Sequence, residues 1–261
     1  MEHSGTPRTL GRMRIVVANI QSGIGVTKGY RQYLSSGWRY ILPHAGEGAL
    51  GAGTLLRLED ADVALLTEVD GGSHRSRGIS QLEVIARESG LSHAQFFPTR
   101  SVGASINEGN AVLSRFPITR SQSYPLKSRV NPRVLGETAL DVQGTPVTVL
   151  VAHLALNTRF REAQLREIAE RVRSVDGPLI LGGDFNERDH RAFAALRRAG
   201  LEAVSVASYP SWKPRHALQV LFHTRDVTIT RASVPNDAPF SDHLPLIVHA
   251  ELTDIPMPTL P

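Results

Sequence analysis

Residues 179–187, with the sequence LILGGDFNE, constrain the fold most strongly. The apolar run that ends at Leu181 predicts a short buried strand, and the two glycines after it are expected to end that strand abruptly. Asp184 and Asn186 follow at a spacing that puts both side chains on one face of an extended chain. Asp184 could hold a hard cation or accept a proton from water, and Asn186 could orient that water or a phosphoryl oxygen. The same letters are also ordinary turn chemistry, so this segment needs support from the rest of the chain.

The other predicted elements are strands in pairs with helices interspersed. Strands are predicted at 13–21, 62–67 and 110–116, in a hairpin of 135–142 and 146–153, and at 201–206, 217–223, 226–234 and 244–251. Helices are predicted to end near residue 60, to span 80–89 and 160–173, and to begin at Asp189. Since strands and helices do not strictly alternate, the pattern argues against a Rossmann domain or a TIM barrel. It favours an α/β (α+β) fold in which two mixed, mainly antiparallel sheets are flanked by helices.

Residues 12–254 are expected to form a single domain, because no linker or low-complexity segment interrupts them. Residues 1–11 are polar, residues 255–261 are rich in proline, and both ends are expected to be loose. The start lacks the apolar segment of a signal peptide, and no apolar run approaches the roughly 18 residues of a membrane span. A cytoplasmic location is therefore the default expectation, and no obligate protein partner is evident.

Composition narrows the possible chemistry. The chain has no cysteine, which excludes disulfides, thiolate metal sites and a cysteine nucleophile. Its formal net charge of +4 suits an anionic substrate but falls short of a surface that coats nucleic acid.

Polar side chains gather at the ends of the predicted strands. They are Asn19 and Gln21, Glu68 and Asp70, His153, Asp184 and Asn186, and the pair Asp242 and His243. Each has an ordinary structural explanation, such as a satisfied core amide or a turn cap, but the rim of a sheet can gather such groups into one cleft.

These residue types also make chemical sense as a set. Glu68 and Asp242 offer oxygen ligands for Mg²⁺ or Mn²⁺, and without cysteine a zinc site is less natural. Asp184 can activate water, and the asparagines can donate to phosphoryl oxygens. His153 and His243 can neutralise charge as it develops. Together these groups could catalyse in-line hydrolysis of a phosphate ester.

In this order the segments resemble the endonuclease/exonuclease/phosphatase superfamily, which includes deoxyribonucleases, apurinic-site endonucleases, sphingomyelinases and inositol-polyphosphate phosphatases. The matching segments are 18–21, 66–70, 109–117, 152–154 with Arg161 and Gln164, 183–186 and 241–245. The resemblance implies a four-layered α/β sandwich. It also implies a Mg²⁺- or Mn²⁺-dependent hydrolase of phosphate esters, with phosphodiesters the expected class.

The resemblance assigns roles position by position. Glu68 corresponds to the principal metal ligand, with Asn19, Gln21 and Asp242 nearby. Asp184 corresponds to the group that aligns or deprotonates the attacking water, with Asn186 beside it. His153 and His243 correspond to an acid–base pair that contacts phosphate, and Asn110 and Asn19 to further phosphate contacts.

One position departs from the family pattern. The family carries an Ile-Asp-Tyr-Ile strand whose aspartate orients the last histidine, and residues 218–221 are its simplest counterpart here. Gln219 at the aspartate position can accept a hydrogen bond from His243 beside the phosphate, but it cannot stabilise an imidazolium as a carboxylate would. A shifted alignment would give the role to Asp226 or another acid.

The substrate stays open at this level. Residues 22–53 interleave tyrosines and Trp38 with cations, which suits recognition of the non-reacting part of a substrate, although these aromatics could equally pack the insertion onto the sheet. Arg129 and Arg133 could form a phosphate-facing loop, with solvated arginines as the simpler expectation. A hydrolase of a lipid headgroup or small phosphodiester, a DNA or RNA nuclease, and an inactive binding module on the same fold are the alternatives.

Overall fold

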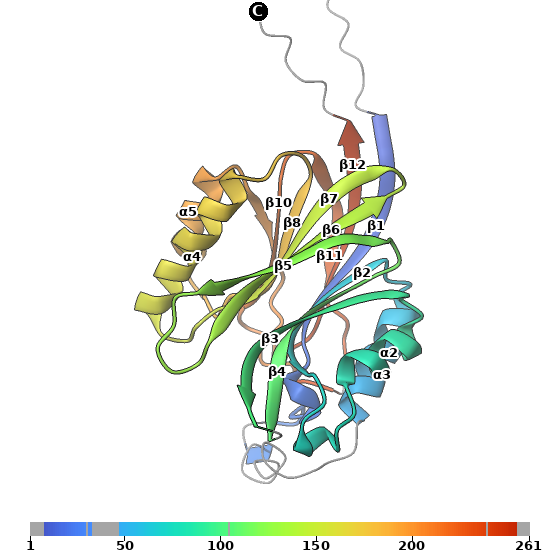
Figure 1. Ribbon diagram of the computed structural model, residues 1–261, viewed down its shortest axis with the longest axis vertical. Helices are drawn as coiled ribbons and strands as arrows, with labels where there is room; N and C mark the ends of the chain where they lie inside the picture. Colours follow the sequence, from blue (N-terminus) through green and yellow to red (C-terminus); the bar gives the residue numbers. More distant parts are fainter. Residues whose placement is uncertain (1–7, 30, 33–46, 104, 239, 255–261) are drawn as a thin grey trace, which may run out of the picture.

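The computed structural model describes residues 8–29, 31–32, 47–103, 105–238 and 240–254 (Figure 1). Its strands form two six-stranded mixed sheets. The first has the order β11-β12-β1-β2-β4-β3, with β1 Arg8–Asn19, β2 Val63–Asp70, β3 His93–Val102, β4 Ile106–Ser114, β11 Val227–Ser233 and β12 Leu246–Asp254. The second has the order β5-β6-β7-β8-β10-β9, with β5 Ile118–Leu126, β6 Arg133–Val142, β7 Thr145–His153, β8 Leu179–Asp184, β9 Glu202–Val204 and β10 Gln219–His223.

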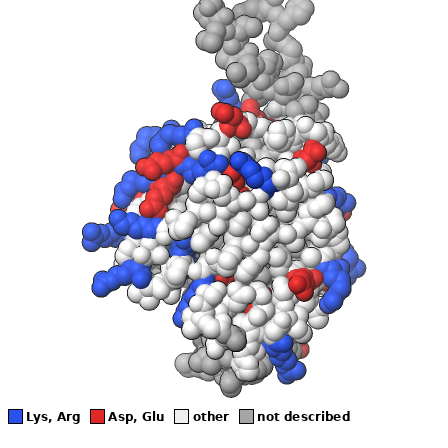
Figure 2. All heavy atoms as spheres, in the orientation of Figure 1, with Lys and Arg blue, Asp and Glu red and all other residues white. Residues whose placement is uncertain are grey.

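Helices cover the outer face of each sheet. Helices α2 (Glu47–Leu58) and α3 (Gln81–Ser89) lie on the first sheet, while α4 (Thr158–Arg173) and α5 (Ala194–Arg198) lie on the second (Figure 1). Short 3₁₀ turns η1 (Gln21–Gly23), η3 (His74–Ser76) and η4 (His190–Phe193) complete the elements. Charged side chains of both signs gather on the side where α4 and α5 lie (Figure 2). Among the described helices, none combines the length and apolar character that a membrane crossing needs.

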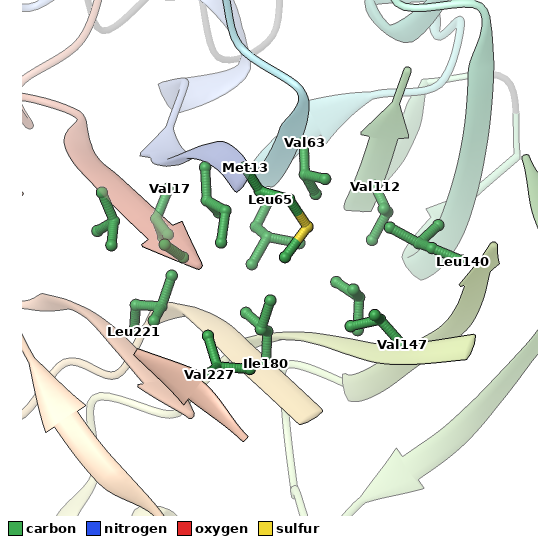
Figure 3. Packing of buried hydrophobic residues seen from close by; sticks show 14 of the residues in the cluster. Met13, Val17, Val63, Leu65, Val112, Leu140, Val147, Ile180, Leu221 and Val227 are labelled. Atoms are coloured by element: carbon green, nitrogen blue, oxygen red, sulfur yellow. The ribbon is translucent and has the colours of Figure 1, made fainter. Parts of the chain in front are cut away.

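Three apolar clusters separate these layers. Val17, Leu65, Ile180 and Leu221 belong to the cluster between the two sheets (Figure 3). The other two clusters fill the spaces between each sheet and its own helices. The predicted four-layered α/β sandwich with mixed, mainly antiparallel sheets is therefore confirmed: only the β1–β2 and β7–β8 pairs are parallel among the described ladders.

The two parallel strand pairs, β1–β2 and β7–β8, end at one edge of the sandwich. Asn19 pairs with Thr67 in the first sheet, and His153 pairs with Asp184 in the second, so all four strands finish at the same edge of the sandwich. Strands β10 and β12 are antiparallel to their neighbours and therefore begin at that edge. This edge is where the predicted polar residues were expected to meet.

The prediction that the two glycines of LILGGDFNE end the strand is wrong. Strand β8 continues through Gly182 and Gly183 to Asp184, so the glycines lie inside the strand and do not end it. A Cβ on Gly182 would lie 2.5 Å from Leu65 of the facing sheet, and Gly183, at φ +152°, would place one 1.8 Å from the Ala152 oxygen. Glycine is needed here because β8 is pressed against both a neighbouring strand and the opposite sheet.

Three other differences concern strand ends and edges. Strand β1 begins at Arg8, which pairs with Asp254, so residues 8–11 belong to the sheet where a loose lead was expected. Strands β3 and β5 were not predicted, because both are edge strands and most of their residues are exposed or only half-buried. An edge strand lacks the continuous apolar run of a central one and tolerates proline, as Pro98 and Pro125 show.

Candidate active site

A cleft of about 480 Å³ opens at the edge where the strands end. Its lining includes seven of the predicted site residues, namely Asn19, Glu68, His153, Asp184, Asn186, Asp242 and His243. They come from both sheets and from sequence positions more than 220 residues apart.

Alternation along the strands aims these side chains at the cleft. In β1, Ile15 and Val17 face the other sheet, and Asn19 continues that row. In the second sheet, Val151 is followed two residues later by His153. The site is thus the polar end of the core between the sheets.

Asn19 joins the two sheets at this point. Its Nδ2 donates to Oε1 of Glu68 at 2.9 Å and to Oδ2 of Asp184 at 3.0 Å, and its Oδ1 accepts from the backbone N–H of Gln21. The amide is buried, and both of its polar atoms are occupied. Asn19 therefore positions the two carboxylates relative to each other.

A β-bulge turns Glu68 toward the cleft. Leu66 pairs with Ala111 and Val69 with Gly109, so two residues of β2 oppose one residue of β4. Glu68 sits in this bulge at φ +55°. Because a bulge shifts the alternation by one residue, Glu68 faces the other sheet, where regular alternation would have aimed it at the helices.

The surroundings of Glu68 are unfavourable to its negative charge. Burial, together with the charges of Glu108, Asp242 and Asp184, raises the pKa of Glu68 to about 8, although the hydrogen bond from Asn19 acts in the opposite direction. A carboxylate held among other carboxylates in this way is stabilised by a cation.

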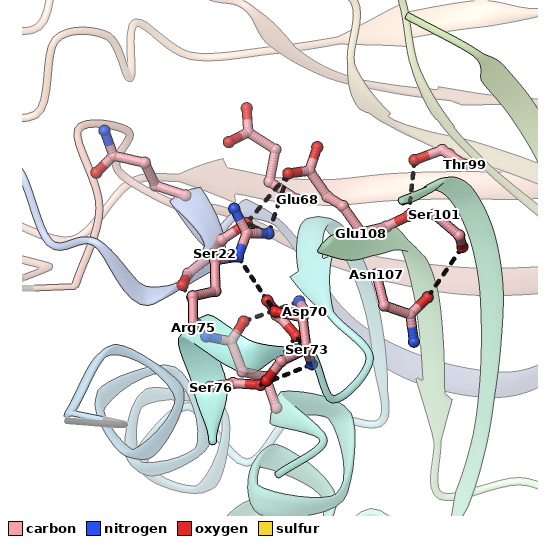
Figure 4. A network of polar contacts seen from close by, with 12 residues as sticks. Ser22, Glu68, Asp70, Ser73, Arg75, Ser76, Thr99, Ser101, Asn107 and Glu108 are labelled. Carbon is pink, nitrogen blue, oxygen red and sulfur yellow. Dashed lines mark hydrogen bonds and ion pairs between the residues drawn. The ribbon is translucent and has the colours of Figure 1, made fainter. Parts of the chain in front are cut away.

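Asp70, at the end of β2, has a structural role. Its carboxylate accepts from Arg75 Nε at 2.5 Å, from the Ser73 and Ser76 hydroxyls and from two backbone N–H groups, and it is fully buried. Figure 4 shows the Arg75 guanidinium between Asp70 and Glu108, with Glu68 above them. Asp70 therefore has no free lone pairs for a metal ion, whereas Glu68 projects into the cleft.

The donor set fits a hard divalent cation. Within the described residues, no three His, Asp or Glu side chains are already arranged around one point as metal ligands. The cleft nevertheless offers the Glu68 and Asp242 carboxylates, and the mutual repulsion around Glu68 is relieved when a cation binds. Glu68 and Asp242 are the residues that would hold Mg²⁺ or Mn²⁺.

His153 and Asn186 form a hydrogen-bonded pair that identifies the imidazole tautomer. Asn186 Nδ2 donates to the Leu154 carbonyl at 2.9 Å, and its second hydrogen points to His153 Nε2 at 3.0 Å. Nε2 is then an acceptor, so the proton of the neutral ring is on Nδ1, 3.9 Å from Glu68 Oε1. Burial, assisted by Arg133, lowers the pKa of His153 to about 3. His153 is therefore a neutral imidazole whose Nδ1–H can donate a hydrogen bond into the cleft, and its acid–base role stays a prediction.

Asp184 is kept ionised and faces His243. Burial alone would raise the pKa of Asp184, but His243 and the hydrogen bonds from Asn19 and the Asn186 backbone lower it. His243 Nε2 lies 3.7 Å from Asp184 Oδ2, and the His243 ring packs on Tyr209 with centroids 4.6 Å apart. An ionised carboxylate that lines an open cleft can accept a proton from water.

Three of the predicted site residues, Gln21, Asn110 and Gln219, do not line the cleft. Gln21 does not line the cleft, and its side-chain oxygen accepts from the Val26 backbone N–H at 3.0 Å. Asn110 lies opposite the Glu68 bulge, and its Nδ2 donates to the Val134 carbonyl in the other sheet at 3.1 Å. Asn110 therefore fixes the start of β6 next to the cleft, and Gln21 shapes the chain after β1.

The side chain of Gln219 is buried next to Asp184. It pairs with Asp184 in the β8–β10 ladder, yet both of its amide atoms and Nδ1 of His243 have no partner among the described residues. The predicted hydrogen bond between Gln219 and His243 is thus not formed. Asp226, the other candidate, lies before β11, where its carbonyl binds Thr253, and does not line the cleft.

Replacing Gln219 by methionine should raise the free energy of unfolding by about 1–3 kcal/mol. Methionine has a similar length, and it removes two buried polar atoms that find no hydrogen-bond partner within the described part of the chain. Urea unfolding of the two proteins measures the difference. A destabilised variant with a lower rate of hydrolysis would show instead that the amide orients His243.

Arg133, which the sequence suggested together with Arg129 as part of a phosphate-facing loop, is a cleft residue. It lines the cleft, its Nε has no hydrogen-bond partner among the described residues, and it faces the Glu68, Glu108 and Asp184 carboxylates. Burial lowers the pKa of its guanidinium, although these carboxylates oppose the effect. Arg129, the other arginine of that suggestion, does not line the cleft.

Arg161 and Gln164 of the 152–164 motif hold the loop after β7. Arg161 pairs with Glu187 at 2.9 Å and donates to the Ala155 and Leu156 carbonyls. The Gln164 side chain bonds Ala155 N–H and the Lys127 carbonyl. Most of the aromatic insertion, residues 30 and 33–46, lies outside the described residues.

Comparisons with known proteins agree with this geometry. Residues 17–243 match the model of the Endonuclease/Exonuclease/phosphatase family. The uncharacterized protein YbhP of Escherichia coli is 26% identical over 264 residues, which cover 88% of this chain and 94% of YbhP. A family protein from Bacteroides thetaiotaomicron has a similar structure, with a TM-score of 0.72 and 16% identity, covering 96% of this chain and all of that one. A mannosyl-6-phosphatase of the same organism has a TM-score of 0.67 and 16% identity, covering 91% and 99%.

Proposed function

Because this chain belongs to the endonuclease/exonuclease/phosphatase family, whose members are phosphoester hydrolases, we propose that it hydrolyses phosphate esters, phosphodiesters in preference, with Mg²⁺ or Mn²⁺. The observation that carries the proposal is the contact across the two sheets, where Asn19 holds Glu68 and Asp184 in one open cleft.

The reaction that this cleft supports is in-line attack of water on phosphorus. Asp184, kept ionised by its neighbours, accepts the proton of the attacking water. His153 donates its Nδ1–H to a phosphoryl oxygen, and Arg133 compensates the charge that develops there. His243, beside Asp184, contacts the phosphoryl group on the side of the attacking water, and the departing oxygen takes its proton from solvent.

The metal ion would be held by Glu68 and Asp242. When bound, it polarises the phosphate and stabilises the leaving oxygen. Loading can be followed without any substrate, since a bound cation should raise the melting temperature of the wild-type protein.

A nuclease of the same family is the second enzyme reading. Such an enzyme needs a basic surface that follows the phosphate backbone. On the face shown in Figure 2, Lys and Arg lie mainly at the periphery, and the described residues form no continuous basic stripe across its centre. We place small phosphodiesters before nucleic acids because the formal net charge of +4 falls short of a surface that coats nucleic acid, and the inactive binding module last.

A substrate panel with and without metal tests the proposal. The panel contains sugar phosphates and other monoesters, aryl and alkyl diesters, and single-stranded and plasmid DNA. We expect hydrolysis of diesters that stops with EDTA and returns with Mg²⁺ or Mn²⁺. Cleavage of DNA with a steep salt dependence would favour the nuclease, and metal binding without turnover of any ester would identify the binding module.

A further inference from the structure

A second hollow of about 300 Å³ adjoins the cleft, and we call it the side pocket. One wall is formed by the segment 128–133 between β5 and β6, and the other by residues 155–157 with Phe160 of α4. Arg133 and Leu156 line both the cleft and the side pocket. The two hollows therefore share a boundary, and a substrate whose phosphate lies in the cleft can reach the side pocket.

Apolar groups dominate the mouth of the side pocket. Val130 is 82% exposed and Leu156 is 77% exposed. These are the two highest exposed fractions of any large hydrophobic residue in the described part of the chain. Phe160 and Ala155 add further apolar surface. Neighbouring exposed apolar side chains at a cleft mark a surface that is covered by a ligand or partner.

The walls are held in place by bonds to α4. The buried Gln164 connects them, since its oxygen accepts from Ala155 N–H at 2.9 Å and its nitrogen donates to the Lys127 carbonyl at 2.7 Å. Glu167 accepts from Lys127 N–H at 2.8 Å. A pocket with fixed walls requires little ordering when a ligand binds.

We propose that the side pocket binds the apolar alkyl or aryl group of a phosphate ester whose phosphate is held at Arg133. This inference rests on the proposed function and specifies its substrate class: esters of apolar alcohols. A nucleotide would place a polar sugar and further phosphates against the apolar side chains of Val130 and Leu156. Of the described residues that line the side pocket, only Arg129 and Arg133 are cations that could pair with those phosphates.

Binding of methyl, butyl and hexyl phosphate, measured by calorimetry with and without Mg²⁺, tests the inference. These probes share one phosphate and differ only in apolar length. Since each buried methylene favours binding, hexyl phosphate should bind at least about 10-fold more tightly than methyl phosphate. Val130→Asp should reduce that ratio to about 2 or less, because it places a charge and a polar group at the pocket mouth.

Leu58→Asp is the matched control. Leu58, at the end of α2, is 76% exposed and lines neither hollow, so the ratio should stay at its wild-type value. Val130→Ser serves as a second variant if Val130→Asp does not fold. Equal affinity for the three probes, no binding of any of them, or the same ratio in the Val130 variants and the wild type would overturn the inference.

A different result would contradict the proposed function. If the probes bind with the expected ratio and no ester in the panel is hydrolysed, the side pocket stands and the catalytic proposal falls. If diesters are hydrolysed but affinity does not follow chain length, the catalytic proposal stands and the side-pocket inference falls.

Discussion

Replacing Asp184 by alanine should lower kcat for phosphate ester hydrolysis by at least about 10²-fold, with a smaller effect on KM. The reason is that Asp184 is the ionised carboxylate of the cleft, where His243 and two hydrogen bonds outweigh the effect of burial and leave its pKa low. Removal of a general base typically costs this much. Steady-state kinetics on the best diester of the panel measures it.

Two further variants separate chemistry from structure. Asp184→Asn keeps the size of the side chain, so a similar loss of rate would identify the charge as the cause. Asp176→Ala is the matched control, since this exposed aspartate precedes the same strand at its other end. If Asp184→Asn retained wild-type kcat, Asp184 would not be the base.

Replacing Glu68 by glutamine should have opposite effects on activity and stability. Activity should fall by about 10²-fold or more, because the variant lacks the carboxylate that we propose as the principal metal ligand. The metal-free protein at pH 8 should become more stable by about 1–3 kcal/mol, because an unfavourable buried charge is removed. About a quarter of the Glu68 side chain is exposed, which keeps this gain well below the value that full burial would give.

The stability difference should depend on pH in a defined direction. Glu68 titrates near its usual value of 4.5 when the chain is unfolded and at about 8 when it is folded, so between these values the folded state binds more protons. The metal-free wild type therefore loses stability as the pH rises from about 4.5 to about 8, and the glutamine variant lacks this loss. Thermal unfolding across this range checks it, and a variant that is less stable than the wild type at pH 8 would contradict it. Mg²⁺ should stabilise the wild type but not the variant.

Much of the site could be predicted from sequence because strands have direction and period. Once residues 13–21 and 146–153 are taken as strands, Asn19 and His153 must stand at strand ends. Each of these polar residues has an ordinary structural explanation, but their repeated occurrence at the ends of apolar strands indicates a shared site. The order of the segments also identified the family, which the match over residues 17–243 confirms.

Other features depend on contacts that a local pattern does not contain. Gln21 turns to the Val26 N–H group, and Asn110 bonds the opposite sheet, although both belong to segments that match the family. Arg133 enters the cleft because its loop is fixed by Gln164, 31 residues further along the chain. The edge strands β3 and β5 lack the apolar run that would have predicted them.

The sequence by itself determined which chemical groups are present, their order, and which strands carry them. Tertiary structure alone decided which of them face one another. Glu68 shows the physical reason: side chains alternate along a strand, so a single extra residue in β2 moves its carboxylate from the helix side to the cleft. Such a bulge is defined by pairing with β4, and the partner strand lies some 40 residues away in the sequence.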